Sequence, residues 1–254
     1  MYTDTRRFPD ALRKFETLLN ITPDDPQTLT SEAGILQAMG DLPRATAVLA
    51  PLYSKADDGG TIDTQAYQAI LERRTASIIP RLKEILAKPE LTPGDRKGTL
   101  YFWLGWAQNI GGDHQGAHES WTQARNELEP RFKEQPESFF ISGVLALTYI
   151  SLGENSLATT LADRTVAANP IEKDASTGPL SLEVFARVTA ATGDHDRSIT
   201  ALKKLLSIPY EGPFASHVPL TLALLKLDPM FDPLRNDPRF KALTESSAAP
   251  VASK

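Results

Sequence analysis

Two histidines four residues apart are the first candidates for metal chemistry in this sequence. His114 and His118 would share one face of a helix, with Glu119 beside them, and imidazoles at that spacing can hold a divalent cation. The pattern is not His-Glu-x-x-His, and no third ligand is obvious. In the repeat register described below, both histidines fall on an outer, solvent-facing helix. We therefore expect no metal site.

The other candidates for catalysis lack essential parts. Ser216 and His217 adjoin in a loop bounded by Gly and Pro, but a hydrolase needs a third partner and a nucleophile elbow. Residues 94–98 contain Gly and Lys without the spacing of a phosphate-binding loop. Carboxylates such as Glu127 and Glu129 fall on surface-facing positions, which argues against the facing acids of a glycosidase. We expect no enzyme activity, catalytic residue or cofactor.

Composition excludes further classes of function. The 254 residues are 41% hydrophobic and 23% charged, which is typical of a globular chain with a sizeable core. The absence of cysteine excludes disulfides and thiolate chemistry, and a net charge of −5 argues against general nucleic-acid binding. No apolar run approaches the roughly 20 residues that span a bilayer, and no secretory signal is readable at the N-terminus. We expect a cytoplasmic protein without nucleic-acid or membrane partners.

The elements that would position any site are indicated by an internal repeat. Gly40, Gly112, Gly153 and Gly193 are each followed by an acidic residue and, five positions after the glycine, by a small residue. The last three recur about every 40 residues, and the first interval spans two units, one of them degenerate. Each glycine would end a helix in the left-handed conformation, and the acidic residue would cap the next helix. The small residue would let two antiparallel helices approach closely.

The segments around these turns have the periodicity of amphipathic helices, and none alternates with period two for long enough to indicate a sheet. Prolines at positions 23, 89, 130, 136, 170 and 209 mark expected helix ends. Between Asp63 and Lys88 two helices remain but the glycine turn is lost. The sequence predicts an all-α fold, an α-solenoid of stacked antiparallel helical hairpins.

The repeat positions resemble the tetratricopeptide repeat, whose signature has large, small and Gly positions at set offsets. One unit matches closely at Tyr101, Leu104, Gly105, Gly112, Ala117, Trp121, Ala124 and Pro130, and the next at Leu145, Ala146, Tyr149, Gly153, Ala158 and Pro170. The units around Gly40 and Gly193 match more weakly. The resemblance implies a module that binds a protein or peptide partner through the first helix of each pair.

That resemblance also implies which residues form the binding groove. Carried onto this sequence, they are Phe102, Trp106, Asn109, Phe140, Gly143, Leu147, Ile150, Glu183 and Arg187. The set is mainly apolar, so a Lys/Arg/Asn clamp for a C-terminal carboxylate is not expected. Some of the aromatic and leucine side chains would instead pack between hairpins, and the sequence leaves both alternatives open. We expect Trp106 to be the main anchor.

A second resemblance covers residues 100–243, with segments 173–175, 178–179, 227–235 and 237–240. This part of the sequence is similar to the closing tetratricopeptide region of bacterial multidomain regulators. In those regulators the repeats follow a Ser/Thr kinase, a winged-helix domain with a TolB-like segment, or an adenylate cyclase. This implies the scaffold or sensor part of a signalling or transcription regulator. The partner would then include an upstream domain of the same polypeptide.

The domain organisation follows from these patterns. Residues 1–243 are expected to form one helical repeat domain, with weaker repeats over 1–95, clearer repeats over 96–209 and a capping segment over 210–243. Asp232-Pro233 and Asp237-Pro238 would each start a helix in that segment, and residues 244–254 would form a disordered tail. The first helix, about residues 7–20, has an apolar face (Leu12, Phe15, Leu19) that can pack on the following helix, but the outer end of the stack would stay bare. A free-standing adaptor that forms a homodimer through this helix is therefore an alternative, and a helical-toroid enzyme is a weaker one.

Overall fold

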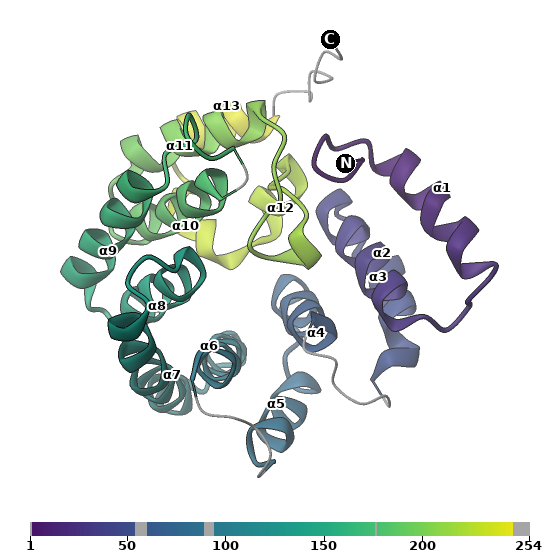
Figure 1. Ribbon diagram of the computed structural model, residues 1–254, viewed down its shortest axis with the longest axis horizontal. Coiled ribbons are helices and arrows are strands. Elements are labelled where there is room, and N and C mark those ends of the chain that lie inside the picture. Colours follow the sequence, from purple (N-terminus) through teal and green to yellow (C-terminus); the bar gives the residue numbers. More distant parts are fainter. Residues whose placement is uncertain (1, 54–59, 89–93, 176, 246–254) are drawn as a thin grey trace.

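The computed structural model describes residues 2–53, 60–88, 94–175 and 177–245, and all regular elements among them are helices (Figure 1). The all-α class is therefore confirmed. The α-helices are α1 (Phe8–Leu19), α2 (Pro26–Met39), α3 (Leu42–Leu49), α4 (Gly60–Leu71), α5 (Ile78–Leu86), α6 (Asp95–Ile110), α7 (His114–Glu134), α8 (Phe139–Ser151), α9 (Asn155–Ala168), α10 (Gly178–Ala191), α11 (His195–Ser207), α12 (Leu222–Leu227) and α13 (Pro238–Glu245). Three short 3₁₀ helices are η1 (Ala50–Leu52), η2 (Ala215–His217) and η3 (Pro229–Leu234).

Consecutive helices pack in pairs, and each pair also contacts the next. The closest associations are α6 with α7, α8 with α9, α10 with α11 and α2 with α3, while α7–α8, α9–α10 and α8–α10 join neighbouring pairs. In Figure 1 the pairs follow one another around an arc, with α4, α6, α8 and α10 toward the centre and α7, α9 and α11 outside. The inner helices therefore surround a common central region.

The glycine turns behave as the sequence predicts. Gly40, Gly112, Gly153 and Gly193 have φ values of 81°, 85°, 78° and 84°, in the left-handed region where a Cβ is costly. Asp41, Asp113 and Asp194 each cap the following helix through a backbone N–H. Glu154 makes no such cap and pairs with Arg125 instead. The small residues Ala45, Ala117, Ala158 and Ser198 are fully buried between paired helices.

The degenerate unit keeps the same turn with a different residue. Arg73 has φ 55°, its N–H donates to the Ile70 carbonyl, and the Arg74 N–H donates to the Ala69 carbonyl. Gly40 and Asp41 make bonds at the same offsets in the first turn. A left-handed conformation costs a residue with a Cβ about 1–2 kcal/mol. The Arg73 guanidinium also forms two bonds with Asp232, of 3.0 and 2.8 Å.

Three predicted boundaries need correction. Pro130 does not end a helix, because α7 continues through it to Glu134. Asp232-Pro233 lies inside η3, and Asp228 caps that helix by accepting from the Met230 N–H. Asp237 does cap α13 as predicted, accepting from the Arg239 N–H at 2.8 Å. The helix α13 extends to Glu245, two residues into the predicted tail; residues 246–254, like Pro89, lie outside the described residues.

The two ends of the arc meet through the N-terminal segment. The Arg6 guanidinium donates to the carbonyl oxygens of Leu205, Ile208 and Leu220, at 2.9, 2.7 and 3.1 Å. The Tyr210 N–H also donates to the Asp4 carbonyl, at 3.3 Å. The three carbonyls that accept from Arg6 belong to the end of α11 and the segment after it, so Arg6 connects the two ends of the arc.

The first helix is only partly covered by this arrangement. Helix α1 packs against α2, with Phe8 and Ala11 buried and Leu12 half-buried. Leu18 and Ile21 remain exposed at its other end. At the outer end of the stack, which the sequence predicts to be bare, the exposed large apolar side chains of this segment are those of Leu18 and Ile21, at the C-terminal end of α1.

Replacing Arg6 tests this closure. Arg6→Met removes three bonds from a charged donor, so the free energy of unfolding should fall by about 2 kcal/mol in urea denaturation. Amide hydrogen exchange should accelerate over residues 205–210. Arg7→Met is the matched control, because Arg7 is exposed and its ion pair with Asp10 should contribute less than about 1 kcal/mol. Equal effects of the two substitutions would contradict a closing role for Arg6.

Candidate functional site

Residues 210–234, called the interior segment below, run through the centre of the arc. Helix η2 contacts α2 and α4, α12 contacts α2, and η3 contacts α10. In Figure 1 this yellow-green segment lies inside the ring of helix pairs. Part of the inner surface of the arc is therefore covered by the protein itself.

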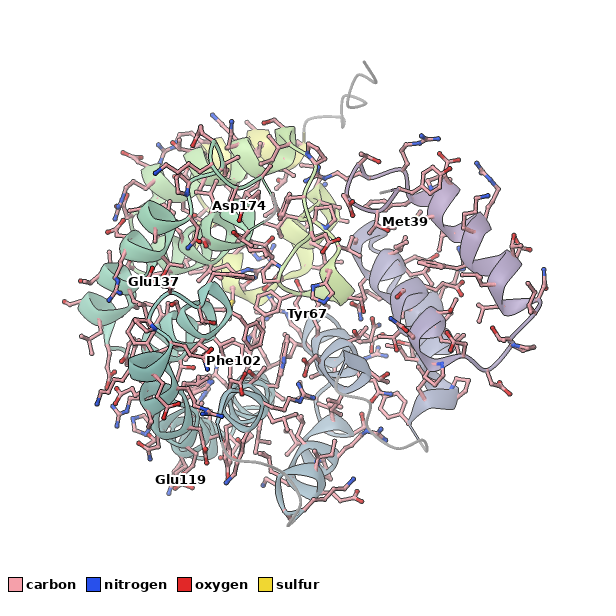
Figure 2. The ribbon with its side chains drawn as sticks, viewed as in Figure 1. Met39, Tyr67, Phe102, Glu119, Glu137 and Asp174 are labelled. Atoms are coloured by element: carbon pink, nitrogen blue, oxygen red, sulfur yellow. The ribbon has the colours of Figure 1, made fainter. Side chains whose placement is uncertain are left out.

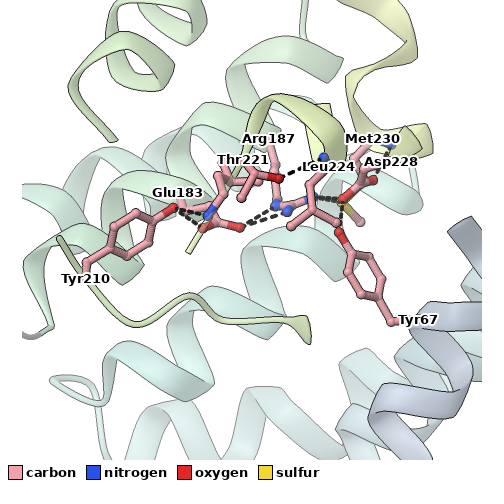
Figure 3. Close-up of polar contacts among 9 residues, drawn as sticks. Tyr67, Glu183, Arg187, Tyr210, Thr221, Leu224, Asp228 and Met230 are labelled. Carbon is pink, nitrogen blue, oxygen red and sulfur yellow. Dashed lines mark hydrogen bonds and ion pairs between the residues drawn. The ribbon is translucent and has the colours of Figure 1, made fainter. Parts of the chain in front are cut away.

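A buried ionic cluster holds this segment in place (Figure 3). Arg187 on α10 donates to Glu183 at 2.8 Å and to Asp228 at 2.5 Å, and these three side chains are at most 2% exposed. The Tyr67 hydroxyl on α4 donates to Asp228 at 2.7 Å, and the Tyr210 hydroxyl donates to Glu183 at 2.6 Å. The cluster thus joins α4, α10 and both ends of the interior segment.

Burial and pairing oppose each other in this cluster. Burial raises the pKa of Glu183, and the charge of Arg187 and the Tyr210 hydrogen bond offset only part of that rise. Burial lowers the pKa of Arg187, but the attraction of Asp228 and Glu183 is stronger and raises it overall. The guanidinium also lies 4.6 Å from the Phe214 ring centroid and 4.8 Å from that of Phe231. Arg187 is therefore a charged residue enclosed on every side by this chain.

The structure places Glu183, Arg187 and Trp106 in the interior, where they face no open surface. Trp106 is 4% exposed and stacks on Trp103, with ring centroids 5.5 Å apart and planes inclined by 12°. Phe214 from the interior segment lies 5.9 Å from Trp106. Of the two alternatives left open by the sequence, core packing applies to Trp106, and also to Phe102 and Leu147, which are 1% and 2% exposed. The loop partner of Trp106, Phe214, is over 100 residues away in sequence, so local pattern could not show it.

The remaining predicted groove residues fall into two groups. Phe102, Phe140, Gly143 and Leu147 line one pocket, whereas Asn109 and Ile150 are half-buried outside it. The Asn109 side chain instead hydrogen-bonds His114 Nδ1 at 2.9 Å. Figure 2 shows Phe102 toward the centre of the molecule and Glu119 at its outer edge.

This pocket, called the central pocket below, has a volume of about 780 Å³ between the inner helices and residues 211–217. One wall is apolar and is formed by Phe102, Phe139, Phe140, Val144, Leu147, Leu180 and Val184. The opposite wall is polar and includes Gln27, Thr30, Ser31, Thr61, Asp63, Thr64 and Thr99. Phe140 is 49% exposed, and so presents an aromatic ring that the protein leaves uncovered.

Residues 211–217 form the third wall, which the sequence presents only as a connector. Ser216 and His217 have φ values of 52° and 65°, so two successive residues with side chains are held in the left-handed region. The Ser216 hydroxyl lies 3.1 Å from the Thr30 carbonyl and 2.7 Å from the Thr64 hydroxyl. The Gly212 N–H donates to the His217 carbonyl at 2.9 Å. These bonds fix the loop against α2 and α4, where it shapes the pocket.

Among the described residues, the structure brings no further catalytic or metal-binding groups to the histidine pair or to Ser216 and His217. His114 and His118 are exposed on α7, and the described residues contain no cluster of three metal-ligating side chains. The Ser216 hydroxyl is engaged by Thr30 and Thr64, on the polar wall. In the same described part of the chain, no helix combines the length and apolarity needed to cross a membrane. What the site offers is a shaped, amphipathic pocket.

Comparisons with known proteins give no family for this chain: neither the protein-family models nor the curated proteins contain a match.

Removing the cation from the buried cluster tests its role. Arg187→Met leaves Glu183 and Asp228 buried without a counter-charge, so the free energy of unfolding at pH 7 should fall by about 3–5 kcal/mol. Unpaired burial raises the carboxylate pKa in the folded state above its unfolded value. The folded variant then binds more protons than the unfolded chain, and its deficit should shrink as pH falls from 7 to 5. Urea denaturation across this range measures both effects; a deficit that is constant with pH would contradict them.

The interior position of Trp106 gives a separate prediction. Trp106→Ala removes a large side chain from the core, so it should lower the free energy of unfolding by about 3–5 kcal/mol. Thermal and urea denaturation followed by circular dichroism would measure the loss. A variant as stable as the original protein would place Trp106 outside the core.

Proposed function

We propose that this chain is a tetratricopeptide-like α-solenoid that binds a protein or peptide segment in its central pocket. The single observation that carries the proposal is the half-exposed ring of Phe140 on the apolar wall of a pocket of about 780 Å³. Binding sites for ligands are usually concave, largely apolar and of this size, with a few polar groups that fix orientation. The paired helices and their left-handed glycine turns support the solenoid part of the proposal.

A peptide suits the two-walled shape of the pocket. Apolar side chains would pack on Phe140 and Val144, while Gln27 and Ser31 on the opposite wall supply an amide and a hydroxyl that can hydrogen-bond a peptide backbone. An uncovered aromatic ring surrounded by buried residues is typical of a binding hot spot. We assign the role of anchor to Phe140, because Trp106 is already covered by Phe214.

In a cell this binding would serve the scaffold or sensor part of a regulator, and the chain itself would catalyse no reaction. A free-standing adaptor remains the second candidate. The exposed side chains of Leu18 and Ile21 at the end of α1 favour it, because they offer an apolar surface to a second copy. The two candidates share the central pocket and differ in what the end of α1 contacts.

Selection from a random peptide display library tests the proposal directly. We expect enriched peptides whose affinity falls by roughly tenfold or more in Phe140→Ala, as is usual when a hot-spot residue is truncated. The variant should lose less than about 1 kcal/mol of stability, because its side chain is half-exposed. Fluorescence anisotropy with labelled peptides would measure the affinities.

Leu157→Ala is the matched control, because Leu157 is equally exposed, at 53%, but lies on α9 away from the pocket. It should leave peptide affinity unchanged. Peptides that bind Phe140→Ala as tightly as the original protein, or a selection that enriches none, would contradict the proposal.

A further inference from the structure

The described residues that line the central pocket include acidic side chains and one histidine, but neither lysine nor arginine. The ionisable side chains among them are those of Asp63, Glu211 and His217. A second hollow, of about 580 Å³ beside α11, is different, because Arg197 and Lys204 both line it. The absence of lysine and arginine among the described lining residues thus distinguishes the central pocket from this second hollow.

The two acids of the pocket differ in their surroundings. Asp63 forms an ion pair with Arg96 on α6, with N–O distances of 2.9 and 3.0 Å, so its charge is largely balanced. Glu211 lies on the exposed loop that forms the third wall, and the described residues show no hydrogen bond or ion pair of its side chain. Glu211 therefore contributes an unbalanced negative charge to the lining of the pocket.

We infer that the central pocket selects peptide segments in which an apolar side chain is accompanied by a lysine or an arginine. The inference rests on the proposed function and specifies its ligand. The apolar side chain occupies the wall around Phe140, and the cation lies beside Glu211. The long aliphatic stem of a lysine or arginine suits this position, because it can lie along Phe214 and Pro213 while its charge remains in water.

Electrostatics disfavour the opposite kind of ligand. A C-terminal carboxylate, a phosphate or an acidic side chain would meet the charge of Glu211 and would find no lysine or arginine on any described wall of the pocket. Such like-charge contacts reject wrong partners even when shape would permit binding. Selectivity thus comes from repulsion of anions as much as from attraction of cations.

The peptides recovered in the display selection provide the probe. We expect them to be enriched in Lys and Arg next to apolar residues, and to bind more weakly as salt is raised. Glu211→Gln should reduce the affinity of such a peptide about twofold to fivefold, the usual effect of losing one exposed ion pair, and Glu211→Lys about tenfold. Glu119→Lys, the same charge reversal on the outer face of α7, should change it less than twofold. Replacing the basic residue of the peptide by Gln should abolish the effect of Glu211→Gln.

The outcomes separate this inference from the function on which it rests. Peptides that require Phe140 but carry no basic residue, or that bind Glu211→Lys unchanged, would overturn the charge selectivity and leave the pocket as the binding site. Peptides enriched in acidic residues would do the same. Affinities unaffected by Phe140→Ala would reject the proposed function itself, whatever the charge of the peptides.

Discussion

The arrangement of this molecule depends on the charge of Arg187. A guanidinium that is 1% exposed must be neutralised nearby, because isolating a charge from water costs far more than a domain of this size can tolerate. Glu183 supplies one partner from the preceding turn of α10, but Asp228 comes from the segment that follows the last helix pair. The ion pair with Asp228 therefore holds the interior segment at the centre of the arc. The hydrogen bond from the Tyr67 hydroxyl to Asp228 also connects this segment to α4.

The shape of the central pocket follows from the fixed position of the interior segment. With Asp228 fixed, Phe214 lies against Arg187, Trp103 and Trp106, and Ser216 reaches Thr30 and Thr64. The interior segment thereby covers Trp103 and Trp106 on α6 and leaves uncovered the first turn of α8, where Phe140 lies. A buried ion pair contributes little net stability compared with an apolar core, but it fixes one arrangement among several compact ones. Here we attribute to it the division of the inner surface into a filled part and an open pocket.

Local sequence signals predicted the parts of this fold that depend on neighbouring residues. A glycine followed by an acid and a small residue specifies a helix end, a cap and a close helix contact, and the structure has each of these where expected except the cap at Glu154. The turn at Arg73 could not be predicted in this way, because it has the left-handed conformation and the hydrogen bonds of the glycine turns but no glycine. The resemblance to the tetratricopeptide repeat assigns Glu183 and Arg187 to a groove because its register places them on the inner helix of a pair. Their partners Asp228 and Tyr210 are distant in sequence and belong to no repeat, so no pattern could pair them.

The same interior segment limits what a partner can do. A ligand that needed the whole inner surface would have to displace residues 210–234, which would strand Arg187, Glu183 and Asp228 without their partners. Breaking a buried pair of this kind costs about 3–5 kcal/mol, equivalent to a loss of more than a hundredfold in affinity. A short segment that enters the open pocket avoids this cost entirely. Affinity is then set by few contacts, the ring of Phe140 and the walls beside it, and discrimination among apolar segments must come from the polar and charged groups at the edge.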